Sequence, residues 1–246
     1  GGAGFIGSRL ALALRTRGYA VRVLDTLSPQ IHGDDPEQSS LYRTIVGEVE
    51  FMRGSVTDRD DLCRALAGID TVIHLAAETG TGQSMYPIQH YSDVNVGGTA
   101  LLLDLIANQP FPVKKLVVAS SRAIYGEGRY TCIEHGTIYP AMRTSQAMQG
   151  GQFEPVCPHC ERTVLAEATD ETTPGRPSSI YGVTKLTQEQ LVLIFCQALR
   201  ISVLAFRYQN VYGPRHSLSP TSPGLLSILS PRLRPGPPIT LFTAGR

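Results

Sequence analysis

The first eight residues, Gly1-Gly-Ala-Gly-Phe-Ile-Gly-Ser8, decide the fold, because glycines stand at positions 1, 4 and 7. Glycines at this spacing permit a tight turn, close approach of a pyrophosphate to the backbone, and close packing of the following helix. Apolar residues at helical spacing over 5–17, followed by Gly18, predict that helix. Free N–H groups and the helix dipole attract anions at a helix N-terminus. The stretch therefore predicts a dinucleotide-binding turn, with a purely structural turn as the alternative.

An acid follows this turn at the distance that dinucleotide recognition requires. Residues 20–25, Ala-Val-Arg-Val-Leu-Asp, predict a short strand that ends on Asp25, 18 residues after Gly7. A carboxylate at that place can accept a hydrogen bond from a ribose 2′-OH and would repel a 2′-phosphate. The pattern favours NAD over NADP, and a solvated Asp is the alternative.

Apolar strands and helices alternate along the rest of the chain. Strands are predicted at 20–25, 49–54, 71–77, 115–121 and 202–208, and helices at 5–17, 58–67, 91–107 and 180–199. This order predicts an α/β fold with a doubly wound, mostly parallel Rossmann-type sheet and helices on both faces. Ligands bind beyond the carboxyl ends of such strands.

The domain organisation follows from where this rhythm stops. Residues 1–210 are expected to form an NAD-binding Rossmann domain, interrupted by an irregular insertion at 127–178 that is rich in Gly, Pro and polar residues. Residues 211–246, with the apolar run 225–229, lie outside this rhythm; the family resemblance given below implies that they begin a C-terminal substrate-binding lobe, truncated here. Because the strand expected before Gly1 is missing, we expect a fragment cut at both ends.

Composition excludes several classes of function. The chain has 246 residues, 42% of them hydrophobic, and a net charge of +1. A charge this small creates no general attraction for nucleic acid or an anionic membrane. No apolar run approaches the roughly 18 residues of a membrane span. We expect a cytoplasmic protein with neither nucleic acid nor membrane as partner.

A candidate catalytic set combines a helix face with a strand end. Tyr181 and Lys185 lie four residues apart on the helix predicted at 180–199 and so share a face. A nearby ammonium should lower the pKa of the tyrosine and allow it to act as a general base. Ser121, at the end of a predicted strand, could bind the same substrate hydroxyl. A solvated helix face is the alternative.

Together these motifs resemble the extended short-chain dehydrogenases/reductases, in their NAD-dependent nucleotide-sugar epimerase/dehydratase branch. The matching stretches are G-G-A-G-F-I-G, V-L-D, H-L-A-A, N-V-G-G-T, A-S-S-R-A-I-Y-G, Y-G-V-T-K and R-Y-Q-N-V-Y-G-P-R, in family order from residue 1 to 215. The resemblance implies Ser121, Tyr181 and Lys185 as the catalytic residues. It implies cofactor contacts from Gly1, Gly4, Phe5, Ile6, Gly7, Asp25, Ser55, Val56, Leu75, Ala76, Ala77, Asn95, Ser120, Tyr181, Lys185 and Tyr208. Ser121, Arg122 and Asn210 would face the nucleotide-sugar substrate, and a homodimer is expected.

Two departures from the family pattern bear on function. Ser55 stands where relatives carry an Asp for the adenine, which weakens or replaces that contact. Arg122 and Ala123 stand where similar dehydratases place an Asp and a Glu for the elimination of water. The sequence therefore predicts a 4-epimerase, with a 4,6-dehydratase or decarboxylase as the alternative. A non-catalytic NAD-binding regulator is a second alternative.

The insertion carries a separate set of candidate ligands. Cys132 and His135 form one pair, and Cys157 and Cys160 another, at a spacing typical of zinc sites. A structural zinc is predicted, with free thiols or a redox pair as alternatives and His159 as an alternative to His135. A bound zinc ion would make the insertion either a loop stabilised by metal or a module that binds a partner.

A narrower resemblance points to the substrate. The stretches D-T-L-S-P-Q-I-H-G (25–33) and G-Q-S-M-Y (82–86), together with the insertion, are similar to dTDP-L-rhamnose 4-epimerase-like members of the family.

Overall fold

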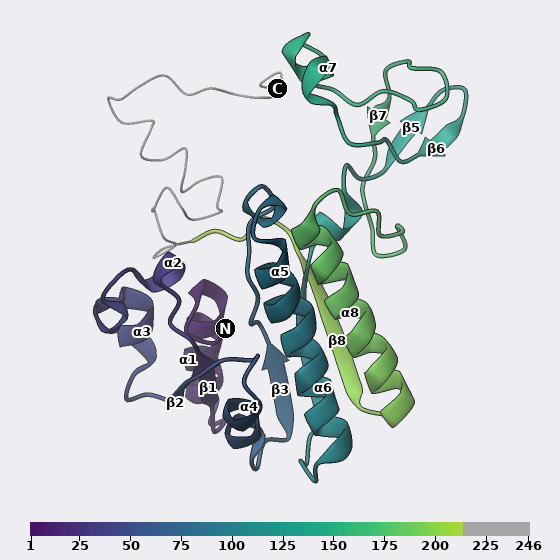
Figure 1. Ribbon diagram of the computed structural model, residues 1–246. Coiled ribbons are helices and arrows are strands. Elements are labelled where there is room, and N and C mark those ends of the chain that lie inside the picture. Colours follow the sequence, from purple (N-terminus) through teal and green to yellow (C-terminus); the bar gives the residue numbers. More distant parts are fainter. Residues whose placement is uncertain (214–246) are drawn as a thin grey trace.

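The structure, a computed structural model, describes residues 1–213; the predicted apolar run 225–229 and nearly all of the expected lobe 211–246 lie outside the described residues. Figure 1 shows the order of the elements. The helices are α1 (Phe5–Thr16), α2 (Pro29–His32), α3 (Ser40–Ile45), α4 (Arg59–Leu66), α5 (Ile88–Tyr91), α6 (Gly98–Asn108), α7 (Ser145–Gln149) and α8 (Ile180–Leu199). Short helical turns are η1 (Pro36–Gln38), η2 (Gln83–Met85), η3 (Ser92–Gly97) and η4 (Arg122–Tyr125). The strands are β1 (Arg22–Asp25), β2 (Glu50–Arg53), β3 (Thr71–His74), β4 (Lys115–Ser121), β5 (Tyr130–Cys132), β6 (Gly136–Ile138), β7 (Leu165–Ala166) and β8 (Ser202–Tyr208).

The five strands predicted from the sequence form parallel ladders in two groups. Strand β1 pairs with β2, and β4 lies between β3 and β8. All these pairings are parallel, as the apolar, uninterrupted strand sequences predicted. The first residue lies between the two groups: the Gly1 nitrogen donates to the Leu24 carbonyl at 2.9 Å, and the Gly1 backbone approaches Ala76 closely. The carboxyl ends of the strands therefore meet the glycine turn at one edge.

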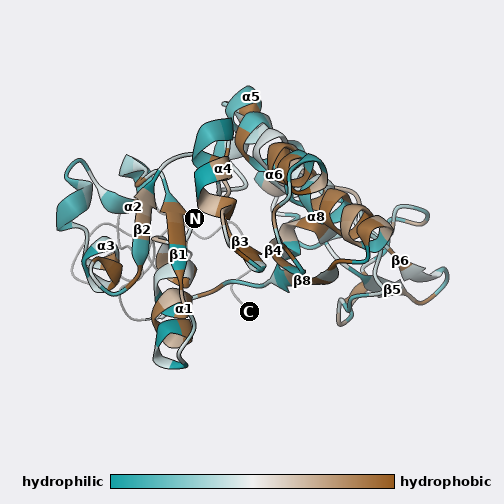
Figure 2. Ribbon diagram, turned by 90° about the horizontal axis from the view of Figure 1, so that it is seen from below, coloured by the Kyte–Doolittle hydropathy of each residue, from teal (hydrophilic) through white to brown (hydrophobic). Residues whose placement is uncertain are grey.

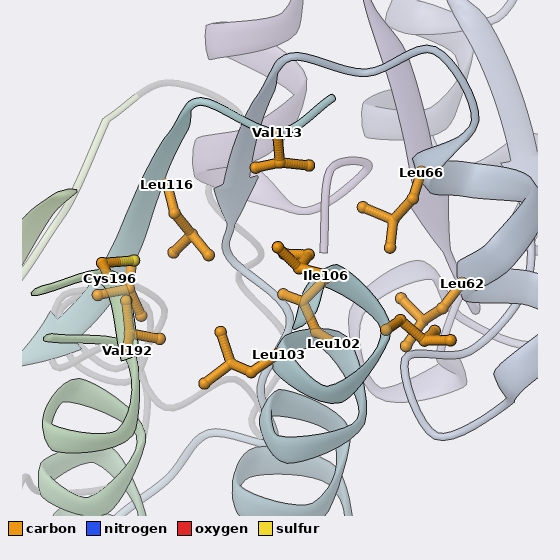
Figure 3. Packing of buried hydrophobic residues seen from close by; sticks show 11 residues of the cluster. Leu62, Leu66, Leu102, Leu103, Ile106, Val113, Leu116, Val192 and Cys196 are labelled. Atoms are coloured by element: carbon orange, nitrogen blue, oxygen red, sulfur yellow. The ribbon is translucent and has the colours of Figure 1, made fainter. Parts of the chain in front are cut away.

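Helices cover the strands on both sides, which confirms the doubly wound arrangement. Figure 2 shows α4, α6 and α8 on one side of the strands and α1 on the other. The larger core lies under α4, α6 and α8, where buried leucines meet Leu116 and Val118 of β4. Figure 3 shows how side chains from these helices point toward one another over the sheet. A second, smaller core around Val23 and Ile45 joins α1 and α3 to β1.

The long helix predicted at 91–107 is more complex than its sequence pattern. It begins earlier, as α5, and passes through a π-helical turn, η3, before it becomes α6. Such a turn accommodates one extra residue within a helix. None of the helices in the part of the chain that the structure describes is long and apolar enough to cross a membrane.

The insertion is more regular than the sequence predicted. Strands β5 and β6 form an antiparallel hairpin, and β7 pairs with the other edge of β5. Each strand has only two or three residues, too few for an alternating pattern to be recognised. Four side chains, Cys132, Ile138, Cys157 and Val164, form a small core of their own. Figure 1 places this sheet beyond the carboxyl end of β8, next to the start of α8.

Candidate active site

A cleft of about 1740 Å³ runs along the carboxyl ends of β1, β3, β4 and β8. Its walls come from the glycine turn, from the loops after the strands and from the first turns of α8. Of the residues predicted to bind cofactor or substrate, those lining the cleft are Gly1, Gly4, Phe5, Ile6, Gly7, Asp25, Ser55, Val56, Leu75, Ala76, Ala77, Ser120, Ser121, Arg122, Tyr181, Lys185, Tyr208 and Asn210. Residues distant in the sequence are thus gathered in one depression.

The glycine turn is closely packed on one side and open on the other. A Cβ at Gly7 would lie 2.6 Å from the carbonyl oxygens of Gly1 and Gly2. Gly4 precedes the first turn of α1, and a Cβ there would meet only the Gly1 oxygen, at 3.5 Å. Asp25 holds the turn: its two carboxylate oxygens accept the N–H groups of Ala3 and Leu27, each at 2.9 Å. Oδ2 also lies 3.4 Å from the Gly1 nitrogen, so Oδ1 is the oxygen that keeps a lone pair for a ligand.

Ser121 and Tyr181 meet at the centre of the cleft. Ser121 ends β4, and its hydroxyl accepts the N–H of Ala123 at 3.1 Å. Tyr181 lies in the first turn of α8, where its N–H donates to the Ser84 hydroxyl at 3.0 Å. Burial raises the pKa of Tyr181, although its hydrogen bond with Ser121 and the charge of Arg122 oppose that rise. The sequence predicted a pKa lowered by Lys185, and burial outweighs any such effect here.

Lys185 lines the cleft and belongs to a buried polar network. Its side chain is 3% exposed and donates to the amide oxygen of Gln188. Burial lowers the pKa of Lys185 to about 7, against the opposing charge of Glu189. The Gln188 amide nitrogen lies 2.9 Å from His74 Nε2 and 2.8 Å from the Thr99 hydroxyl. The sequence analysis did not predict Gln188. Its position three residues after Lys185, on the same face of α8, could have indicated it.

Asn95 is the one predicted cofactor residue that the structure places below the cleft rather than on its wall. Its side chain is fully buried and bonds to both the N–H and the carbonyl of Glu78, at 2.7 and 3.1 Å. It also donates to the Thr184 hydroxyl at 2.9 Å. Asn95 therefore joins the loop after β3 to α8, next to Lys185.

The predicted substrate side of the cleft is more open. Arg122 is exposed and donates to the Asn210 amide oxygen at 3.3 Å. Ser55 belongs instead to the predicted cofactor contacts. Its backbone N–H donates to Asp61 at 2.8 Å, and its hydroxyl is hydrogen-bonded to that of Thr57.

The four predicted metal ligands converge in the insertion. Cys132, His135, Cys157 and Cys160 form a Cys/His cluster whose ligand atoms all lie within 4.8 Å of one another. Cys132 Sγ lies 3.6 Å from His135 Nδ1 and 3.7 Å from Cys160 Sγ, and Cys157 Sγ lies 3.6 Å from the same His135 nitrogen. His159 is not part of the cluster, and its ring contacts that of His135, with the centroids 5.0 Å apart.

The close approach of the thiols in the Cys/His cluster shifts their pKa values. The hydrogen bond with His135 lowers the pKa of Cys132 to about 6. A backbone hydrogen bond from Arg162 lowers the pKa of Cys160, but burial and the neighbouring thiols outweigh it and raise that pKa to about 11. Several thiolates can coexist at such distances when a cation lies among them.

Comparison with known proteins gives consistent results. The model of the NAD dependent epimerase/dehydratase family matches residues 1–147 and 154–246. The chain is 35% identical to a dTDP-L-rhamnose 4-epimerase of Burkholderia thailandensis, over 100% of this chain and 66% of that protein. It is 29% identical to a UDP-glucose 4-epimerase of Streptomyces lividans, over 87% of this chain and 51% of that protein.

Solved structures show the same similarity. The UDP-glucose 4-epimerase of Thermotoga maritima with UDP-glucose has a TM-score of 0.69 and 26% identity, over 94% of this chain and 60% of that one. The UDP-glucose 4-epimerase of Thermus thermophilus in complex with NAD has a TM-score of 0.66 and 27% identity, over 94% and 58%. The chain spans between half and two thirds of the length of these proteins.

Proposed function

Because the chain belongs to the NAD dependent epimerase/dehydratase family, we propose that it forms most of the catalytic half of an NAD-dependent nucleotide-sugar 4-epimerase, an isomerase. The observation that carries the proposal is the meeting of Ser121 and Tyr181 at the cleft, above the buried Lys185. These three residue types supply a hydrogen-bonding hydroxyl, a proton acceptor and a positive charge at one place.

The cleft fits a dinucleotide. Gly4 leaves open space at the N-terminus of α1, where a pyrophosphate can approach the backbone N–H groups. Asp25 lines the same cleft, and its Oδ1 can accept a hydrogen bond from a ribose hydroxyl, which supports NAD over NADP. When bound, NAD⁺ would accept a hydride from C4 of the sugar and later return it.

The protein residues would move the proton that accompanies this hydride. Ser121 would hold the sugar 4-OH, and Tyr181 would take its proton and later give it back. Since burial raises the pKa of Tyr181, proton transfer requires positive charge nearby, and Lys185 lies four residues along the same helix. Rotation of the 4-keto sugar between the two hydride transfers would invert C4.

Residues 122 and 123 argue against the dehydratase alternative. Elimination of water needs an additional acid and base, and Arg122 and Ala123 supply neither. Arg122 instead bonds to Asn210 at the open side of the cleft. The same two residues disfavour a decarboxylase, and the assembled Ser121 and Tyr181 disfavour a non-catalytic regulator.

As substrate we propose dTDP-L-rhamnose. The proposal rests on the similarity to the Burkholderia enzyme over the whole of this chain. To test it, the full-length protein is incubated with dTDP-L-rhamnose, UDP-glucose or UDP-galactose without added nicotinamide, and C4 epimers are sought by NMR. We expect one donor to be epimerised, and Tyr181→Phe to lose this activity. Absence of any epimer from an NAD-loaded protein would refute the proposal.

We also propose that the Cys/His cluster binds a structural zinc ion. Zn–S bonds of about 2.3 Å place the ligands of a tetrahedral site about 3.8 Å apart. Three separations of 3.6–3.7 Å within the cluster approach this value. The one between two sulfur atoms, Cys132 Sγ and Cys160 Sγ, is 3.7 Å, far longer than a disulfide bond of about 2.05 Å. Because the core of the insertion is small, a bound metal ion would add stability that this core alone does not supply.

Metal analysis tests this proposal. Protein purified without chelator should contain about one equivalent of zinc, and Cys157→Ser should lose it. Cys63→Ser is the matched control, because Cys63 is a free cysteine that packs against the α4 and α6 core. Less than half an equivalent of zinc in the unmodified protein would contradict the proposal.

Two further properties are proposed for the full-length protein. Exposed apolar side chains on α8, among them Val183 at 48% and Ile194 at 68%, support a homodimer formed through this helix. Five free cysteines support a cytoplasmic, reducing location.

A further inference from the structure

The insertion contributes to the cleft as well as carrying the Cys/His cluster. Two of its charged residues, Glu127 and Arg143, line the cleft together with Ser121 and Tyr181. The cluster itself and the three strands of the insertion do not line it. Arg143 lies between β6 and α7, so the insertion extends one loop toward the reacting groups.

Glu127 and Arg143 form an ion pair on the cleft wall. Arg143 Nη2 lies 3.3 Å from Glu127 Oε2, and Arg143 Nη1 donates to the Phe153 carbonyl at 3.0 Å. The Arg143 side chain is 32% exposed and that of Glu127 is 15% exposed. A guanidinium has five N–H donors and a carboxylate about four acceptor positions, so both retain capacity for a ligand.

The backbone next to Glu127 is closely held. Gly126, immediately before it, has φ +62°, and a Cβ there would lie 2.2 Å from the Arg176 carbonyl oxygen. The Arg176 N–H in turn donates to the Ile124 carbonyl at 2.7 Å. The segment that begins at Ser121 is therefore fixed at both ends, and Glu127 cannot move away without disturbing it.

We propose that Glu127 and Arg143 bind hydroxyl groups of the sugar ring of the substrate, and that the insertion is thus a determinant of sugar specificity. A hydroxyl both donates and accepts, and a carboxylate beside a guanidinium offers an acceptor and a donor at adjacent positions. The inference rests on the proposed function, since it requires a nucleotide sugar in this cleft.

The Cys/His cluster would act on substrate binding through this loop. Arg143 is tied to Phe153, and Phe153 lies four residues before Cys157 of the cluster. Fixing Cys157 therefore limits where the Arg143 guanidinium can lie.

The test compares Arg143→Met with Arg129→Met in the full-length, NAD-loaded protein. Arg129 also belongs to the insertion and pairs with Glu167 at 2.8 Å, but it does not line the cleft. Arg143→Met should raise KM and the Kd for the nucleotide sugar about tenfold or more, with kcat little changed. Arg129→Met should leave both within about twofold of wild type. Arg143→Lys should recover part of the affinity, and zinc and NAD contents should match in all variants.

The outcomes separate this inference from the proposed function. Epimerisation with an unchanged KM in Arg143→Met, or an equal rise in both variants, would overturn the inference alone. Binding of dTDP-L-rhamnose, UDP-glucose or UDP-galactose that depends on Arg143 but is followed by no epimerisation would overturn the epimerase proposal alone. Binding of none of the three by wild type would overturn both.

Discussion

Two glycines of the first turn should respond differently to the same added methyl group. In Gly7→Ala the new Cβ would lie 2.6 Å from three backbone atoms of Gly1 and Gly2, where 3.4 Å is an ordinary contact, so the helix must move by roughly 0.8 Å. Overpacking of this kind costs about 1–3 kcal/mol, and the better helix propensity of Ala returns up to about 1 kcal/mol. A net loss of about 1 kcal/mol corresponds to a melting temperature lower by roughly 2–4 °C.

Gly4→Ala should instead preserve the fold and weaken NAD binding. Its Cβ would meet a single atom, the Gly1 oxygen at 3.5 Å, and would otherwise project into open space at the cleft. A methyl group there would obstruct a pyrophosphate and raise the Kd for NAD about tenfold or more. Thermal unfolding of NAD-free protein and calorimetric titration with NAD measure the two effects. Normal NAD affinity in Gly4→Ala, or a melting temperature within about 1 °C of wild type in Gly7→Ala, would refute this account of the turn.

Three other substitutions test the buried groups around the cleft. Lys185→Met should abolish epimerisation yet raise the melting temperature of NAD-free protein. The lowering of the Lys185 pKa from 10.5 to about 7 means that burying the charged lysine destabilises the folded wild type by roughly 5 kcal/mol. The variant escapes this destabilisation but leaves the Gln188 oxygen without its donor, which offsets about 1–3 kcal/mol of the gain. Because the lysine of the unfolded wild type stays protonated until about pH 10.5, the gain in stability of Lys185→Met should be fully present below pH 7 and disappear between pH 7 and 10.5. A gain in stability that does not vary with pH would contradict the reasoning. Asp25→Asn should reduce the preference for NAD over NADP, because the charge that repels a 2′-phosphate is removed. An unaltered ratio of the Kd values for NAD and NADP would show that Asp25 does not select between the two cofactors. Thr184→Val should lower the free energy of unfolding by about 1–3 kcal/mol, since the Asn95 amide loses a buried acceptor, and an unchanged urea midpoint would show that this hydrogen bond is not made.

The parallel strands and long helices could be predicted because their sequences carry long, unambiguous patterns. Strands β4 and β8 and helix α8 have the predicted bounds, because each is a continuous apolar segment or a segment of helical period with a clear end. The insertion could not be predicted in the same way. Its strands are two or three residues long, too short for a recognisable period, although the spacing of its cysteines and histidine did indicate the Cys/His cluster.

Motifs predict the residues of the candidate site whose chemistry depends on their type, but they do not predict properties that depend on neighbouring side chains. Ser121, Tyr181 and the glycine turn could be identified from motifs, and they do line one cleft. The raised pKa of Tyr181 could not be foreseen, since it depends on how deeply the fold buries the phenol. Arg143 carried no motif at all; its place on the cleft wall follows from the path of the insertion.

The small sheet of the insertion also affects how the candidate active site comes together during folding. Ser121 and Tyr181 are sixty residues apart, and joining the ends of a longer flexible segment costs more chain entropy. Pairing of β5 with β7, which sets Tyr130 opposite Ala166, removes the residues between them from that segment and leaves about 24 flexible ones. The saving is roughly 1 kcal/mol, so a locally folded insertion lets sixty residues separate Ser121 from Tyr181 at nearly the entropic cost of a much shorter segment.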